Sequence, residues 1–277
     1  MRPLMALKMT SVVKTIASSY FEKGFAVVRN FLPMSDISKI AAESDAIINK
    51  HWKEIEESVK NGDGLKNGVK CGDFVFSLNN VGFDENFNVK SNRRNTMNFV
   101  GFKLHAVSDL FKRVVFTEEA KLILKHLEFR HPVVYQSSII HKAPGAPSLS
   151  LHQDEAYLNN EPKGCGVNFW IAIEDATEDN GSLVIYPGSH RTVKCRKVGL
   201  TEQGAYDDID KSKLVKVMVK KGDLVLLNSL VVHGSEANNT NAIQRSLEFS
   251  VYDKHRVQWS KENFMQDGDT YKFTQMY

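Results

Sequence analysis

The segment Leu151-His152-Gln153-Asp154 places an imidazole and a carboxylate two residues apart. In a β-strand, side chains at positions i and i+2 point to the same face, so His152 and Asp154 would lie side by side. A third candidate, His233, follows the apolar residues Leu230-Val231-Val232 much later in the chain. A histidine on such a strand is the residue that a fold of stacked sheets would use to complete a three-ligand site.

Two histidines and one carboxylate on one side of an octahedral ion leave its other positions open, which suits non-haem iron(II) and its reaction with oxygen. A structural zinc site would be closed by four ligands, usually including thiolates. The three cysteines, Cys71, Cys165 and Cys195, form no CxxC pair. We therefore expect iron(II) at this site, and the odd number of cysteines indicates a reducing compartment without disulfides.

A candidate anion-binding residue, Arg245, opens the predicted strand 245–252. By alternation it shares a face with three apolar residues, Leu247, Phe249 and Val251. A buried arginine needs a partner, and a guanidinium matches a carboxylate in bidentate fashion. We expect Arg245 to return beside the metal, where Ser235, on the same face as His233, can donate to the same carboxylate. The alternative is that Arg245 pairs with an acidic side chain of the protein.

The elements that would position these residues change character near residue 130. After that point, short runs of strand-forming residues are separated by turn signals such as Asn180-Gly181 and Pro187-Gly188. The predicted strands are 133–142, 149–155, 166–174, 181–186, 214–220, 223–228, 230–235 and 245–252. This spacing predicts a mainly β protein with a double-stranded β-helix, the jelly roll of cupins, flanked by α-helices.

Helix signals dominate the N-terminal part of the chain. Ser35 and Thr117 stand where they could cap two helices with regular apolar stripes. Residues 60–96 are rich in Gly, Asn and Asp and predict long loops. We expect a single domain over residues 1–277, divided into mostly helical support and loops (10–130), a jelly-roll core (131–255) and a C-terminal extension (256–277).

Composition narrows the classes of partner. The chain has 277 residues, 42% hydrophobic and 25% charged, and a net charge of +3, which makes no case for nucleic-acid binding. No apolar run approaches the roughly 18–20 residues of a membrane helix. We expect a cytoplasmic protein. The acid-free segment 1–21, with its three basic residues, leaves a mitochondrial location as the weaker alternative. The oligomeric state is left open.

Several motifs, taken together, resemble the phytanoyl-CoA dioxygenase family of iron(II)- and 2-oxoglutarate-dependent oxygenases. The matching stretches are His152-Gln153-Asp154, Phe169–Thr177, Asn180–Leu183, Pro187–His190, His233-Gly234-Ser235 and Arg245, with further likeness at Phe21–Phe25 and Trp259–Asn263. The resemblance runs from about residue 15 to the end of the chain. It therefore covers the predicted jelly roll and the helices before it.

The resemblance implies a site as well as a fold. It implies His152, Asp154 and His233 as iron ligands, Arg245 and Ser235 as the clamp on the distal carboxylate of 2-oxoglutarate, and Trp170, Gln136 and Ser138 as cosubstrate lining. Oxygen would be the second cosubstrate. This sequence departs from the pattern at Phe99, where a relative carries a lysine that touches the cosubstrate. Lys103 or Lys142 could take over that contact.

The substrate is suggested only by charge. Residues 189–221 hold nine Lys or Arg against four Asp or Glu, an excess of five positive charges. If this segment borders the pocket mouth, it favours an anionic substrate; otherwise it is a solvated loop. We expect an iron(II)- and 2-oxoglutarate-dependent dioxygenase that abstracts hydrogen from a small, carboxylate-bearing metabolite, leading to hydroxylation, desaturation or oxidative ring closure.

Three other functions remain open on the same residues. A fatty acyl-CoA 2-hydroxylase would use the same chemistry on a larger substrate. A non-catalytic sensor that binds metal and 2-oxoglutarate, or a zinc hydrolase, would use the same ligands. A zinc hydrolase, or a sensor that retained the metal alone, needs no carboxylate clamp, so Arg245 and Ser235 argue against those two uses.

Overall fold

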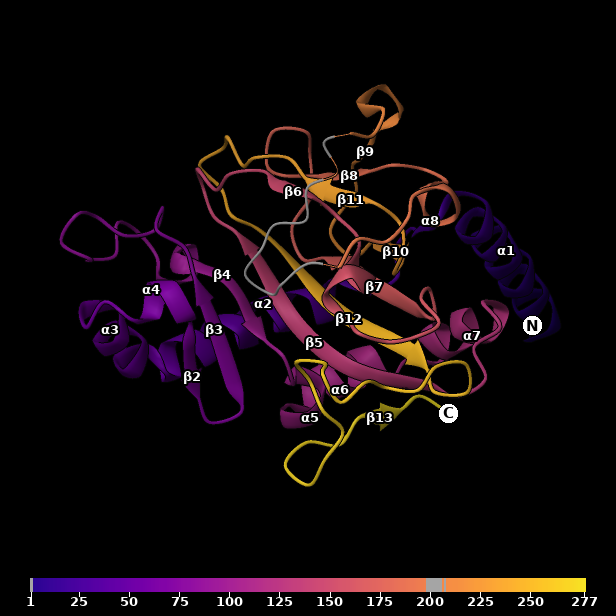
Figure 1. Cartoon of the computed structure of the whole chain (residues 1–277), viewed down its shortest axis with the longest axis horizontal. Helices are drawn as coiled ribbons and strands as arrows, with labels where there is room; N and C mark the ends of the chain where they lie inside the picture. Colours follow the sequence, from indigo (N-terminus) through magenta and orange to yellow (C-terminus); the bar gives the residue numbers. More distant parts are fainter. Residues whose placement is uncertain (1, 198–205, 207) are drawn as a thin grey trace.

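Two antiparallel β-sheets form the centre of the molecule (Figure 1). The computed structural model describes residues 2–197, 206 and 208–277. In spatial order, the larger sheet contains β1 (Phe25–Val28), β10 (Leu224–Asn228), β7 (Gly166–Ala172), β12 (Gln244–Asp253), β5 (Pro132–Lys142), β4 (Met97–Gly101), β3 (Phe74–Leu78) and β2 (Val69–Cys71), and β13 (Thr274–Gln275) pairs with β5. The smaller sheet contains β6 (Leu149–His152), β11 (His233–Ser235), β8 (Leu183–Ile185) and β9 (Val215–Val217).

The larger sheet has an apolar face and a polar face at its centre. On β12, Leu247 and Phe249 belong to the main hydrophobic core, where the ring of Phe249 stacks on Phe169 of β7 at 4.4 Å between centroids. The residues that alternate with them, Ser246 and Glu248, point the other way because side chains alternate along a strand. That second face meets the smaller sheet and encloses the interior of a jelly roll.

Helices cover the apolar face of the larger sheet. They are α1 (Arg2–Lys23), α2 (Met34–Lys50), α3 (Trp52–Lys60), α4 (Gly64–Asn67), α5 (Leu104–Val107), α6 (Asp109–Val115) and α7 (Glu118–His126). Buried residues of these helices, such as Ile40, Ile48 and Leu124, share one core with Phe169 and Phe249 of the sheet. The remaining helical pieces are η1 (Arg93–Thr96), η2 (Asp154–Tyr157), α8 (Ser189–Thr192) and η3 (Lys211–Lys213).

The jelly-roll prediction is confirmed, and each of the eight predicted strands overlaps an observed one, β5 to β12. The N-terminal part was less well predicted. Residues 60–96 contain β2 and β3 as well as the predicted loops, and these two strands extend the larger sheet at one end. The sequence did not predict them because such short strands give no clear alternation. Ser35 does not cap α2, because the helix begins one residue earlier, at Met34. The residue at the N-cap position is Pro33, whose side chain makes no capping hydrogen bond. No helix in the described part of the chain is long and apolar enough to span a membrane.

The C-terminal extension packs against one end of the interior. Trp259 and Phe273 join a separate apolar cluster with Tyr135 of β5 and Tyr252 of β12. The ring of Trp259 lies 4.8 Å from that of Tyr135 and 4.6 Å from that of Tyr252, centroid to centroid. The extension therefore closes this end of the interior with aromatic side chains.

The cap of α7 gives a test of the helical layer. Thr117 accepts a hydrogen bond from the backbone N–H of Ala120 at 3.1 Å, as its position in the sequence predicted. Thr117→Ala should lower the free energy of unfolding by about 1 kcal/mol, measured by chemical denaturation. Thr117→Ser keeps the hydroxyl and should retain most of the stability. Equal losses in the two variants would mean that packing of the methyl group, and not the cap, is responsible.

Candidate metal centre

The two predicted histidine ligands lie opposite one another on neighbouring strands. His152 ends β6, His233 begins β11, and the two residues are register partners in the antiparallel pair. Their ring centroids are 4.4 Å apart. The two histidines are far apart in the sequence, and the pairing of β6 with β11 brings them together.

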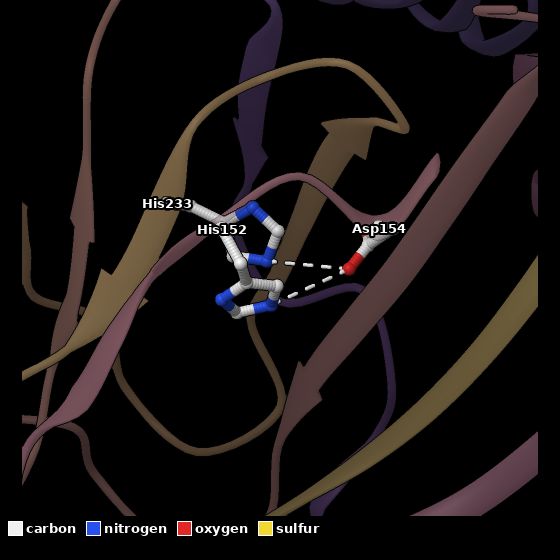
Figure 2. Close-up of side chains that lie close together, drawn as sticks. All are labelled: His152, Asp154 and His233. Carbon is white, nitrogen blue, oxygen red and sulfur yellow. Dashed lines mark ion pairs between the residues drawn. The ribbon is translucent and has the colours of Figure 1, made fainter. Parts of the chain in front are cut away.

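Asp154 completes the group from a turn, where the sequence predicted a strand. It begins η2, the short 3-10 helix that follows β6. Its Oδ1 lies 3.6 Å from the Nε2 atom of His152 and 3.6 Å from that of His233 (Figure 2). The three ligand atoms lie within 4.8 Å of one another, so the structure brings together the whole predicted ligand set.

Hydrogen bonds orient both imidazoles for metal binding. The Nδ1 of His152 lies 2.9 Å from the carbonyl oxygen of Ser150, and the Nδ1 of His233 lies 3.0 Å from that of Val231. A carbonyl can only accept, so each Nδ1 carries a proton, and in the neutral imidazole each Nε2 has the lone pair that binds metal. The donor set therefore fits a divalent metal, with the three ligands on one side of the ion and the other positions open.

Charge and burial at the site also favour a cation. Burial lowers the pKa of His233, and the neutral form of imidazole is the one that binds metal. Burial also lowers the pKa of His152, but the hydrogen bond and charge of Asp154 outweigh it and raise that pKa. Burial would raise the pKa of Asp154, but the two histidines and the side chain of Asn168 hold it below its usual value. Asp154 thus presents a buried carboxylate to the ion.

Sequence reasoning missed two polar residues beside the ligands, Asn168 on β7 and Glu248 on β12. The Nδ2 of Asn168 lies 3.4 Å from Oδ2 of Asp154 and also donates to Oε1 of Glu248. Burial raises the pKa of Glu248 to about 7, and the charge of Asp154 adds to the rise. The signal was present in the sequence, since Ser246, Glu248 and Ser250 form the polar row of a strand whose other row is apolar.

The three predicted lining residues face the same interior. Trp170 of β7 and Ser138 of β5 are both register partners of Glu248. Gln136 donates to Ser250 at 3.1 Å and keeps a buried Oε1 atom without a partner. Contact of these residues with 2-oxoglutarate stays a prediction, but the unpartnered oxygen is a position from which Gln136 could accept a hydrogen bond.

Arg245 lies on the other face, which corrects the prediction that it returns beside the metal. Its Nη2 is 2.7 Å from Oε1 of Glu174, and its Nη1 is 3.1 Å from Oδ1 of Asp45 on α2 and 3.3 Å from the carbonyl oxygen of Ala41. The alternation along β12 had already grouped Arg245 with Leu247, and that row packs against the helices. The structure therefore has the alternative arrangement, in which Arg245 pairs with acidic side chains of the protein.

Jelly-roll sheets with two histidines and an aspartate at their inner ends define the iron(II)- and 2-oxoglutarate-dependent oxygenase class. The phytanoyl-CoA dioxygenase (PhyH) family model matches residues 20–246. The chain belongs to this family, and it is a dioxygenase that uses iron and 2-oxoglutarate.

Named relatives span most of the chain. Phytanoyl-CoA dioxygenase domain-containing protein 1 of Danio rerio is 32% identical over 233 residues, 80% of each chain. Phytanoyl-CoA dioxygenase 1 of Oryza sativa subsp. japonica is 31% identical over 197 residues, 69% of this chain and 70% of the relative.

Solved structures share the fold at lower identity. The non-heme alpha ketoglutarate dependent epimerase SnoN from nogalamycin biosynthesis superposes with a TM-score of 0.66 at 15% identity, covering 97% of this chain and 99% of that one. EctD from S. alaskensis, solved with 2-oxoglutarate and 5-hydroxyectoine, gives a TM-score of 0.59 at 18% identity, covering 87% and 76%. At these identities the likeness shows the fold alone.

Removal of one ligand should abolish the metal site. His233→Ala leaves two of the three ligands. Mutating a residue that only supports a ligand already costs about tenfold or more in metal affinity, so loss of a ligand should cost more. The affinity for iron(II) is measured by anaerobic titration. His255→Ala removes an exposed histidine on the surface and should bind iron(II) like the parent. Unchanged iron binding by a folded His233→Ala protein would contradict the ligand assignment.

Proposed function

We propose that this dioxygenase oxidises a C–H bond of a small, carboxylate-bearing metabolite, giving hydroxylation, desaturation or oxidative ring closure. The observation that carries the proposal is the convergence of His152, Asp154 and His233 on one point of a buried interior. Bound iron(II) supplies the oxygen chemistry that removes the hydrogen atom. The chain supplies the three ligands, and Asn168 orients the second oxygen of Asp154.

Little empty space remains beside Asp154 in the interior. A cavity of about 10 Å³ lies there, with Tyr135, Asn168 and Tyr252 among its lining residues, which is room for about one water molecule. The aromatic side chains of the C-terminal extension close this end of the interior. This aromatic cluster limits the access of bulk water to a reactive centre, as oxidation of an unactivated C–H bond requires.

The basic segment is attached next to the metal ligands, which supports an anionic substrate. Gln153 stands between His152 and Asp154, and its Nε2 lies 3.4 Å from the carbonyl oxygen of Val193. The hydroxyl of Tyr206 donates to Oε1 of Gln153 at 2.5 Å. Lys194 follows Val193 directly and is exposed. Its positive charge is thus carried on a segment tied to the metal site.

Much of the positive charge of residues 189–221 is paired with nearby acids. The number of Lys and Arg residues therefore overestimates the positive potential that the segment presents to a substrate. Ion pairs join Arg196 to Asp208, Lys213 to Asp210, Lys216 to Glu178 and Lys220 to Asp175. Arg191 donates to the carbonyl oxygen of Glu22 at the end of α1. Two of the acids, Glu202 and Asp207, lie outside the described residues. Lys194 is therefore the cation that best represents the proposal.

A fatty acyl-CoA is the second candidate substrate, and the names of the relatives favour it. Phytanoyl-CoA dioxygenases from rice and Arabidopsis thaliana match this chain at 31% and 25% identity. Both candidates require the same hydrogen abstraction at the same ligands. They differ in whether the substrate presents a free carboxylate or a thioester.

A substrate panel distinguishes these candidates. Substrate-stimulated formation of succinate from 2-oxoglutarate should be measured with small carboxylic acids, with their amides and with the CoA thioesters of the same acyl chains. We expect stimulation by some free acids and little by the matching amides. Stimulation by thioesters alone would replace the proposal with the acyl-CoA function. Binding of 2-oxoglutarate without turnover of any member would favour a sensor.

The role of Lys194 can be tested with an active acid from that panel. Lys194→Glu should raise the KM for the acid several-fold. It replaces a positive charge with a negative one, which should weaken binding of an anion by about 1 kcal/mol or more. The KM for 2-oxoglutarate should stay unchanged. Lys213→Glu changes the charge of the same segment at a residue paired with Asp210 and serves as the matched control. Equal effects of the two variants would show that only the net charge matters.

A further inference from the structure

The interior of the jelly roll contains a buried lysine that sequence reasoning did not assign to the far end of the cosubstrate. Lys142 is the last residue of β5 and the register partner of Gln244, so it shares the interior face with Ser138 and Glu248. It is only 8% exposed. Its Nζ donates to the hydroxyl of Ser235 at 2.7 Å.

This ammonium group has no carboxylate within ion-pair distance in the part of the chain that the structure describes. Glu236 is the nearest acid that affects it, but the carboxylate of Glu236 pairs with Lys216 at 3.5 Å. A buried charge without a counter-ion is expensive, and burial lowers the pKa of Lys142 to about 8. An anion that entered here would remove that cost.

The surrounding backbone makes room for the lysine at this position. A Cβ atom on Gly181 would clash with Cδ and Cε of Lys142, and the φ angle of Gly181 is +101°, a conformation that favours glycine. The amide of Asn238 donates to the carbonyl oxygen of Lys142 at 2.9 Å and holds the end of β5. The side chain is therefore positioned by its neighbours.

The distance from the metal suits one end of a dicarboxylate. Ser235 follows His233 by two residues on β11, roughly 6–7 Å along the strand, and on the same face. 2-Oxoglutarate, a five-carbon diacid, would extend its distal carboxylate over several ångströms if its 2-oxo acid end lay at the three ligands. The hydroxyl of Ser235 and the ammonium group of Lys142 lie together at about this distance from the ligands.

We infer that Lys142 and Ser235 bind the distal carboxylate of 2-oxoglutarate, the role that the family resemblance had assigned to Arg245. The inference rests on the oxygenase function proposed above. Arg245 faces the helices, with its guanidinium group shared between Glu174 and Asp45. It anchors α2 to the larger sheet, while Lys142 supplies the positive charge inside.

The test compares 2-oxoglutarate with 2-oxobutyrate, a 2-oxo acid that lacks the distal carboxylate. Each is titrated into anaerobic iron(II) protein, and the visible band of the chelate is followed. The parent should prefer 2-oxoglutarate strongly. Lys142→Ala should bind iron(II) normally, lose about 30-fold or more in affinity for 2-oxoglutarate, and bind 2-oxobutyrate nearly as the parent does.

Two further variants control the comparison. Lys103→Ala removes a lysine that lies over the ring of Tyr271 and 3.9 Å from Asp73, and it should keep the full preference for 2-oxoglutarate. Arg245→Ala should lower the midpoint of thermal unfolding, and the folded protein should keep its preference. If Lys142→Ala does not fold, Lys142→Met, of similar length and no charge, replaces it.

The outcomes separate the inference from the function on which it rests. A parent-like preference in Lys142→Ala or Lys142→Met overturns the inference, and loss of preference in folded Arg245→Ala returns the role to Arg245. If the parent itself binds no 2-oxoglutarate, the oxygenase function fails as well. Loss of preference confined to the Lys142 variants establishes the subsite.

Discussion

The strict separation of the two faces of β12 is the constraint on which the rest of the structure depends. Leu247 and Phe249 pack against the helices, while Ser246, Glu248 and Ser250 face the smaller sheet. Polar groups are costly to bury without partners, so the polar row requires an interior that offers hydrogen bonds or a bound ion. A slip of one residue in the pairing of β12 would exchange the two rows and destroy both the core and the site.

Much of the site could be predicted from local patterns. The spacing of His152 and Asp154, and the apolar run before His233, were sufficient to name the three residues that the structure brings together. The strands of the jelly roll were predictable because short runs of strand-forming residues recur between turn residues. Asp154 lies beside the histidines although it is in a turn and not in the predicted strand, and its role as a ligand stays a prediction.

The remainder depended on contacts between distant elements, which leave no local signal. Whether a buried arginine faces a ligand or a protein acid is decided by Glu174 and Asp45, which come from a different loop and a different helix. Alternation gave the correct face for Arg245, but the family resemblance gave it the wrong neighbour. Similarly, the burial of Lys142 follows from Ser235 of the opposing sheet and from Gly181 in the turn before β8. The strands β2 and β3 were missed because strands of three and five residues show little periodicity.

The shortness of the smaller sheet has a thermodynamic consequence. Its strands have four, three, three and three residues, and His152 and His233 sit on the pair β6 and β11. Few backbone hydrogen bonds hold such strands, so opening of this sheet should need less free energy than opening of the larger one. A metal ion that joins the two strands and binds only the folded state acts as a cross-link whose stabilising effect grows with metal concentration. Iron supply would then influence the lifetime of the protein against proteolysis in addition to its catalytic activity.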